Sequence, residues 1–220
     1  MNASRIVRSL TVGLALTATA RSDDGTEIQV LQTPGGVRFG VLGAKRPAPA
    51  PVLFVFATSL EDSLANKDYV ECGRILAKQG FLCVSVDVPC HGKDRKGNEP
   101  DGLDGWRARL EKGDDLVREF TARCSAVLDY MIEQGYADPH RVAASGTSRG
   151  GFMALHFAAA DARVKCTAAF APVTNLFSLR EFTGLNQHAA TKAAALANHA
   201  DKLAGRAVCV CIGNHAERVG

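Results

Sequence analysis

The chain of 220 residues carries 26 Lys and Arg against 23 Asp and Glu residues, a formal net charge of +3. This small charge, with no basic run interleaved with aromatic residues, gives no reason to expect nucleic acid as a partner. Hydrophobic residues make up 46% of the sequence, yet no stretch of about 18 apolar residues occurs, so we expect no membrane-spanning segment. The length suits one α/β domain with a sizeable core.

Residues 1–22 are predicted to be a leader or signal segment that precedes the domain at 23–220. Arg5 and Arg8 come before a short apolar run, and Ala18-Thr19-Ala20 resembles a cleavage site. An extra N-terminal strand is the alternative. The cysteines, seven in number and mostly inside apolar runs, favour a reducing compartment, so the cytoplasm is preferred over export. No C-x-x-C pair occurs, and we expect no metal and no cofactor.

An N-terminal hairpin is predicted first. Residues 26–32 and 37–42 alternate between polar and apolar side chains, as half-buried strands do, and Pro34-Gly35-Gly36 between them has the chemistry of a turn. Residues 45–51 contain three prolines and are predicted to be a linker.

From residue 51 onward, apolar strands alternate with helices, which predicts a doubly wound, mostly parallel sheet. The predicted strands are 51–57, 81–87, 141–145, 164–171 and 207–213, and the predicted helices are 67–79, 114–135 and 152–160. Residues 58–63 are predicted to be a polar loop, and residues 93–113 a long charged excursion. The alanine-rich residues 175–205 are predicted to be helical, either as a small cap or as a crossover helix.

The sequence Gly146-Thr147-Ser148-Arg149-Gly150 fits the pattern G-x-S-x-G between a predicted strand and a predicted helix. A serine at the tip of such a turn needs nearly side-chain-free neighbours two positions before and after it. The helix that follows directs its first N–H groups and its positive dipole end at an anion formed beside the serine. The pattern therefore predicts a nucleophile elbow, with an idle serine in a tight turn as the alternative.

These residues resemble the α/β-hydrolase superfamily, in particular its prolyl-oligopeptidase and dienelactone-hydrolase-like branch. Three motifs carry the resemblance: Asp138-Pro139-His140-Arg141-Val142 before Gly146–Gly151, Asp87-Val88-Pro89-Cys90-His91-Gly92, and Gly213-Asn214-His215-Ala216-Glu217-Arg218-Val219. The resemblance covers about residues 26 to 220. It implies an α/β-hydrolase fold whose last strand and helix are missing from this sequence.

The resemblance also implies a catalytic serine, Ser148, with an acid and a histidine base later in the chain. Where the family has its aspartate, this chain has Ala216, and the adjacent Glu217 is the candidate acid. The family's histidine follows one further strand, beyond Gly220, so the order serine, acid, histidine is expected to be incomplete. In such a family the oxyanion is held by the backbone N–H of the residue after the serine, here Arg149, and by a second N–H from Thr58 or Ser59.

Further side chains are candidates for lining the site. His91 and His215 follow strand ends at the expected edge, although a turn residue and a solvated loop residue are the plainer interpretations. Trp106 either lines a pocket or anchors the excursion. The Arg149 side chain either contacts a substrate carboxylate, since guanidinium suits bidentate recognition, or lies at the helix surface.

The function indicated is a serine hydrolase acting on a small-molecule carboxylic ester or related acyl compound, without nucleic acid or membrane partners. The alternative is a catalytically incomplete fragment or pseudoenzyme of the same family. A nucleotide-binding domain is disfavoured because no glycine follows the first parallel strand. Strand 207–213 is expected to be an exposed edge that favours self-association.

Overall fold

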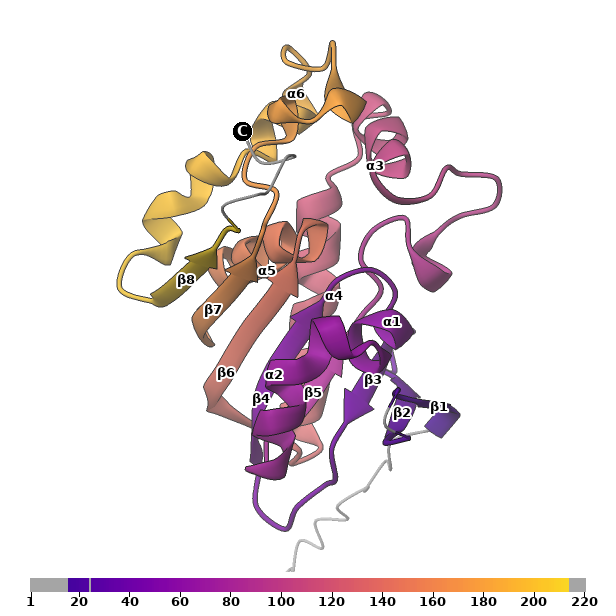
Figure 1. Ribbon diagram of the computed structural model, residues 1–220, viewed down its shortest axis with the longest axis vertical. Coiled ribbons are helices and arrows are strands. Elements are labelled where there is room, and N and C mark those ends of the chain that lie inside the picture. The colour runs from indigo at the N-terminus through magenta and orange to yellow at the C-terminus, as the bar shows by residue number, and fades with distance from the viewer. Residues whose placement is uncertain (1–15, 24, 214–220) are drawn as a thin grey trace, which may run out of the picture.

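The computed structural model describes residues 16–23 and 25–213. They form an eight-stranded sheet in the order β1-β2-β3-β5-β4-β6-β7-β8 (Figure 1). The strands are β1 (Leu16–Arg21), β2 (Glu27–Gln32), β3 (Arg38–Leu42), β4 (Ala50–Phe56), β5 (Leu82–Ser85), β6 (Ala137–Thr147), β7 (Val164–Phe170) and β8 (Ala207–Cys211). Strands β5, β4, β6, β7 and β8 run parallel, which confirms the predicted mostly parallel α/β-hydrolase sheet.

The predicted hairpin is strands β2 and β3, joined through the turn at residues 33–37 and paired antiparallel. β1 adds a further antiparallel strand to it. Residues 16–21 thus form the extra N-terminal strand that the sequence analysis gave as the alternative to a leader. Residues 1–15 lie outside the described residues, so the leader stays a prediction.

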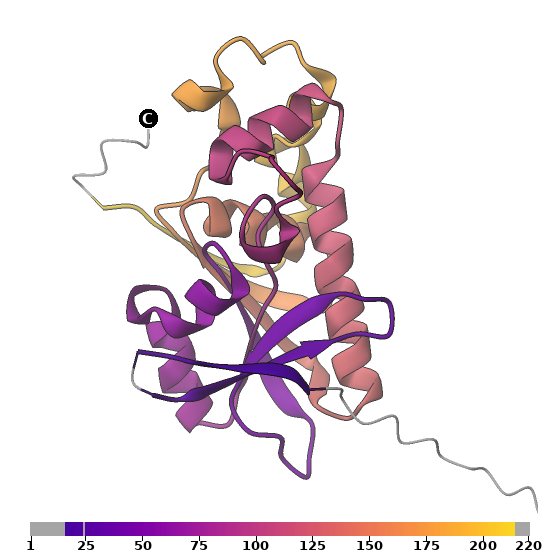
Figure 2. The same cartoon turned by 90° about the vertical axis from the view of Figure 1, so that its right-hand side faces the viewer.

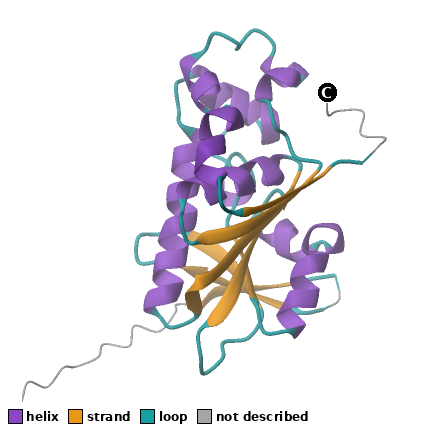
Figure 3. Ribbon diagram, turned by 90° about the vertical axis from the view of Figure 1, so that its left-hand side faces the viewer, coloured by secondary structure: helices purple, strands orange, loops and turns teal. Residues whose placement is uncertain are grey.

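Helices cover both faces of the sheet (Figures 2 and 3). Helices α1 (Leu60–Ala65) and α2 (Lys67–Lys78) pack on one face, and α4 (Leu116–Glu133) and α5 (Arg149–Ala160) on the other. The Asn66 side chain caps α2, and the Asp115 side chain accepts the N–H of Arg118 at the start of α4. Each face has its own apolar cluster: Phe54 and Phe157 meet on the α4–α5 face, and Val55 and Leu64 belong to the cluster under α1 and α2.

Three predicted segments differ in their local structure. Residues 58–63 contain the start of α1 rather than only a loop, because Ser59 accepts the N–H of Asp62 and caps the helix. The excursion at 93–113 contains α3 (Gly102–Glu111), which begins at the capping side chain of Asp101. Residues 175–205 form short helices: η2 (Leu176–Ser178), η3 (Arg180–Phe182), α6 (Ala189–Ala193) and η4 (Leu196–Leu203).

Helix α3 and the segment containing η3 and α6 lie together beyond the carboxyl ends of the parallel strands (Figures 1 and 2). Arg107 of α3 joins them, because its guanidinium donates to the carbonyls of Glu181 (2.8 Å) and Thr183 (2.9 Å). Whether residues 175–205 act as a cap stays a prediction.

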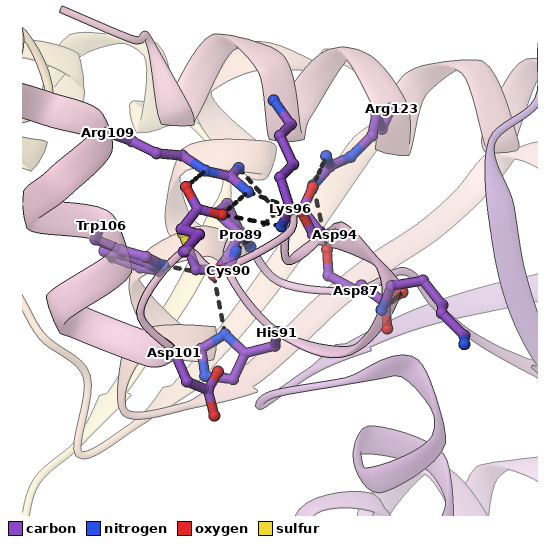
Figure 4. Close-up of polar contacts among 12 residues, drawn as sticks. Asp87, Pro89, Cys90, His91, Asp94, Lys96, Asp101, Trp106, Arg109 and Arg123 are labelled. Atoms are coloured by element: carbon purple, nitrogen blue, oxygen red, sulfur yellow. Dashed lines mark hydrogen bonds and ion pairs between the residues drawn. The ribbon is translucent and has the colours of Figure 1, made fainter. Parts of the chain in front are cut away.

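A buried ion-pair network anchors the excursion (Figure 4). Arg109, whose side chain is 2% exposed, donates to Glu99 through Nε (2.7 Å) and Nη2 (2.8 Å), and its Nη1 lies 2.8 Å from Asp94. Asp94 also pairs with Arg123 of α4 and accepts the backbone N–H of Cys90. Hydrogen bonds from Arg109 lower the pKa of Glu99 to about 2, so the carboxylate stays charged at neutral pH.

We expect Arg109→Met to destabilise the protein by about 3–5 kcal/mol, because removal of one partner leaves the buried carboxylates of Asp94 and Glu99 uncompensated. Urea unfolding followed by circular dichroism measures this loss. The matched control is Arg118→Met, since that guanidinium pairs with Asp115 at the surface and is 80% exposed. Equal loss of stability in both variants would show that the Arg109 network does not anchor the excursion.

Strand β8 is an exposed edge of the described sheet. All five of its residues are exposed, and Val208, Val210 and Ile212 are 42%, 47% and 54% exposed. The carbonyl of Cys211 accepts the N–H of Ala171 beside β7. Because alternate residues of a strand direct their backbone groups to opposite edges, Val208 and Val210 present N–H and C=O groups at the open edge.

We propose that two copies of the chain associate through this uncharged edge. The proposal predicts that the molar mass measured by light scattering rises with protein concentration. Val210→Lys should suppress the rise because it places a charge in the strand pair. Ile75→Lys is the control, since Ile75 is equally exposed (52%) but lies on α2. A constant monomer mass over the whole concentration series would contradict the proposal.

Candidate functional site

Ser148 stands at a sharp turn between β6 and α5. Its φ of 55° and ψ of −120° lie outside the regions that non-glycine residues ordinarily adopt. The turn is held by backbone hydrogen bonds, in which Ser148 N–H donates to the Phe170 carbonyl (2.9 Å) and Ser148 C=O accepts from Val173 (3.2 Å) and Phe152 (3.1 Å). The serine side chain is left exposed at the start of a helix of 12 residues.

Two glycines of the motif are required by close backbone contacts. A Cβ on Gly150 would lie 2.1 Å from the carbonyl oxygen of Phe56 in β4, and a Cβ on Gly146 would lie 2.3 Å from the carbonyl oxygen of Gly150. The turn can therefore form only where both positions lack a side chain. The same contact places the start of α5 directly against the end of β4, where Thr58 and Ser59 follow.

The loop after β4 is held by backbone hydrogen bonds that decide which N–H groups remain available. Ser63 Oγ accepts from the N–H of Ala57 (3.0 Å) and, at 3.4 Å, from the N–H of Thr58. Leu60 N–H donates to Asp87 Oδ1 (2.8 Å). Within the described part of the chain, Ser59 N–H has no acceptor, so of the two predicted residues Ser59 offers the freer second donor.

The turn after β5 connects this loop to the excursion. Val88 N–H donates to the Thr58 carbonyl (3.0 Å), and the buried Asp87 carboxylate accepts from Leu60 and, at 3.1 Å, from Lys93 N–H. Burial raises the pKa of Asp87. Asp87 thereby links the start of α1 to the start of η1 (Gly92–Asp94). Asp87, which the sequence analysis named only as part of a family motif, therefore has a structural role in holding these two segments together.

His91 lies close to the elbow, as predicted, but its ring is engaged. Its Nδ1 donates to the Pro89 carbonyl (2.9 Å), so Nε2 is the acceptor and receives a hydrogen bond from Arg149 Nη1 (2.9 Å). Burial and the Arg149 guanidinium both lower the pKa of His91, which keeps the ring neutral. Arg149 has no carboxylate partner within 4.0 Å among the described residues.

Trp106 anchors the excursion and does not line a surface pocket. It is fully buried, and its Nε1 donates to the Pro89 carbonyl (2.7 Å), the same oxygen that accepts from His91 (Figure 4). Of the two predicted roles, the structure shows the anchoring one. Trp106 thus helps to fix the ring of His91 beside Arg149.

The structure brings Ser148, Arg149, Thr58, Ser59 and His91 to one edge of the sheet. Glu217 and His215 lie outside the described residues, so their predicted roles remain predictions. Sequence patterns did not indicate that Ser63 and Asp87 hold the loop after β4, although Asp87 stands in a motif. The one signal in the sequence was that Asp87 is a charged residue at the end of a predicted buried strand.

Three residues other than glycine have positive φ within the described chain: Cys90, Ser148 and Ala171. They follow β5, β6 and β7 respectively, at the carboxyl ends of adjacent or nearby parallel strands. Such backbone conformations cost of order 1–3 kcal/mol each and gather at functional sites. Their clustering supports this edge as the candidate active site.

Comparisons with solved structures find α/β-hydrolases. An acetyl xylan esterase from Paenibacillus sp. R4 is similar with a TM-score of 0.61 and 18% identity, over 92% of this chain and 83% of the esterase. A glucuronoyl esterase from Solibacter usitatus has a TM-score of 0.54 and 14% identity, over 97% of this chain and 70% of the other. A puromycin-hydrolysing peptidase from Mycobacterium tuberculosis has a TM-score of 0.56 and 15% identity, over 86% of this chain but 30% of the peptidase.

A search of curated protein sequences found no match. The family model described as "Prolyl oligopeptidase family" matches residues 73–194, more than half of the chain and a range that includes the elbow. The structural likenesses show the α/β-hydrolase fold, and the sequence match shows the family within it. The chain belongs to the prolyl oligopeptidase family.

Proposed function

We propose that the protein is a serine hydrolase of carboxylic esters or related acyl compounds, with Ser148 as the nucleophile. The observation that carries this proposal is the strained backbone of Ser148, which holds an exposed hydroxyl at the N-terminus of α5. A positive φ at a serine costs free energy that an idle turn does not need, because glycine adopts it freely. The esterases among the structural relatives support an ester as the substrate.

In this proposal Ser148 Oγ attacks the substrate carbonyl and forms an acyl-enzyme, and water then releases the acid. The backbone N–H of Arg149 lies in the first turn of α5, where no intrahelical acceptor exists. Together with the N–H of Ser59, or of Thr58 if it leaves Ser63, it would hold the oxyanion. The helix dipole favours the same negative charge.

The proposal has two candidates for the base that accepts the Ser148 proton. His91 has the required tautomer, with its proton on Nδ1 and a lone pair on Nε2. It can serve only if Arg149 withdraws from Nε2. His215, with Glu217 as the acid, is the other candidate.

A catalytically silent elbow is the alternative function. Two observations favour it: within the described residues the Ser148 hydroxyl has no hydrogen-bond partner, and the one histidine at this edge is occupied by Arg149. Free serine is a weak nucleophile without an adjacent base. Such a protein would keep the family's fold without turning over esters.

A fluorophosphonate probe separates the two functions. An activated Ser148 forms an Oγ–P bond while fluoride and the serine proton leave, and intact mass spectrometry detects one adduct per chain. We expect labelling of the native chain and none of Ser148→Ala. The control is Ser178→Ala, which removes another exposed serine and should label normally.

Labelling of His91→Gln identifies the base. Loss of the adduct in this variant assigns the base to His91, and retention assigns it to the region after the described residues. No labelling of the native chain would contradict the hydrolase proposal and leave the silent elbow.

We expect Gly150→Ala to abolish labelling and to destabilise the protein by about 1–3 kcal/mol, because the new Cβ meets the Phe56 carbonyl and the backbone must shift. Thermal unfolding followed by circular dichroism gives the stability change. Gly35→Ala is the matched control: its φ is not positive and the nearest atom to the new Cβ is 3.8 Å away. Normal labelling of a well-folded Gly150→Ala protein would show that the close crossing is not needed at the elbow.

A further inference from the structure

A pair of thiols stands on the open edge strand, apart from the hydrolase site. Cys209 Sγ and Cys211 Sγ of β8 are 3.6 Å apart, because residues two positions apart in a strand point to the same face. Both cysteines are free and exposed. The pair is therefore reduced, accessible and already close enough for one ligand atom to touch both sulfurs.

Among the residues that the structure describes, no helix covers the face that carries these thiols at this end of the sheet. In the parallel register Cys209 pairs with Ala168 and Cys211 with Phe170, and paired residues share a face. Phe170 is 39% exposed, and α1 and α2, on the same face, pack over strands farther along the sheet. Cys166 is a third exposed thiol on this face but is paired with Ala207, one residue row beyond Cys209.

Three of the other five cysteines compete poorly for a thiophilic reagent. Cys83, Cys90 and Cys124 are buried, and burial raises the pKa of Cys83 and of Cys90 to about 12. A buried thiol in apolar surroundings is inert. Selectivity among the exposed thiols then depends on whether a ligand needs one sulfur or two.

The separation of the two sulfurs fits a single bridging atom. It exceeds the ~2.05 Å of a disulfide, whereas with bonds of ~2.3 Å, as in metal thiolates, it corresponds to an angle of about 103° at the bridging atom. The described residues contain no group of three or more His, Cys, Asp or Glu side chains that could hold a metal ion. The site therefore suits a centre that needs only two protein ligands.

We propose that Cys209 and Cys211 form a dithiol site for a trivalent arsenical that carries one organic substituent. Arsenic bound to one carbon completes its three bonds with two sulfurs, and it is a soft centre that prefers thiol ligands. The reaction balances without an oxidant: R–As=O and two thiols give two As–S bonds and one water, which takes the oxygen and both thiol protons. The hydrogen bond with Cys209 raises the pKa of the Cys211 thiol.

The site lies near the elbow but is independent of it. Cys211 C=O accepts the N–H of Ala171, and the preceding residue, Phe170, accepts the N–H of Ser148 through its carbonyl. Two backbone hydrogen bonds thus separate the dithiol from the serine. Because no catalytic group takes part, Ser148→Ala should bind the arsenical as the native chain does.

Phenylarsine oxide at one equivalent tests the proposal by intact mass spectrometry under native conditions. We expect one adduct per chain that survives excess glutathione, a monothiol, and is released by 2,3-dimercaptopropanol. Cys209→Ser and Cys211→Ser should each weaken binding by about 100-fold or more, since the second sulfur no longer binds intramolecularly. Cys166→Ser is the matched control and should retain the adduct.

Serine places a small polar side chain at positions that are already exposed, and far-ultraviolet circular dichroism confirms that the variants are folded. Retention of a glutathione-resistant adduct by Cys209→Ser or Cys211→Ser, its loss in Cys166→Ser, or the absence of an adduct on the native chain would each overturn the proposal. Loss of the adduct in Ser148→Ala alone would contradict its independence from the elbow. The outcome does not depend on whether Ser148 is activated.

Discussion

The close crossing of α5 over the end of β4 is the contact on which the site depends. A carbon on Gly150 would lie 2.1 Å from the Phe56 carbonyl, so helix and strand meet backbone to backbone. This approach forces the chain to turn sharply at Ser148 and gives that residue its positive φ. It also brings the loop after β4, with its candidate oxyanion donor Ser59, next to the first turn of α5. The absence of a side chain at Gly150 thus lets the first turn of α5 and the loop after β4 lie next to each other.

A second level of organisation lies in the turn after β5. Asp87 accepts the N–H groups of Leu60 and Lys93, and the Pro89 carbonyl accepts both Trp106 and His91. These few acceptors connect the loop after β4, the excursion and the histidine beside Arg149. Because the groups are buried, their hydrogen bonds cannot be exchanged for water without a free-energy cost. We therefore expect the segments held by this turn to be more rigid than exposed loops.

Two separate sets of residues with possible chemical roles lie near the carboxyl ends of the parallel strands. Ser148 lies at a strained turn at the start of α5, and the proposal of hydrolysis depends on how a base reaches this serine. Cys209 and Cys211 are free thiols exposed on an edge strand of the described sheet. Within the described residues, backbone hydrogen bonds at the end of β7 connect the two sets, and either set can be tested without the other.

The sequence by itself determined the succession of the main strands and helices along the chain, and it indicated the sharp turn at Ser148. Apolar runs such as 51–57 and the pattern around Ser148 depend on local burial and local backbone freedom, which residue types express directly. Helices α1 and α3 were not predicted, because their short and polar segments gain stability from capping by Ser59 and Asp101 and from packing on the rest of the fold. The alanine-rich segment 175–205 has helical propensity but forms only short helices, which contact α3 and α5.

Only the tertiary structure decided what surrounds the serine. That Asp87 accepts the N–H group of Leu60, and that Arg149 occupies the ring nitrogen of His91, depends on residues distant in sequence meeting at one edge. Residue types and spacing carry no information about such meetings. The sequence could indicate Ser148 as the candidate nucleophile because glycine content and backbone strain are local properties, whereas the partners of that serine are set by how the strands assemble.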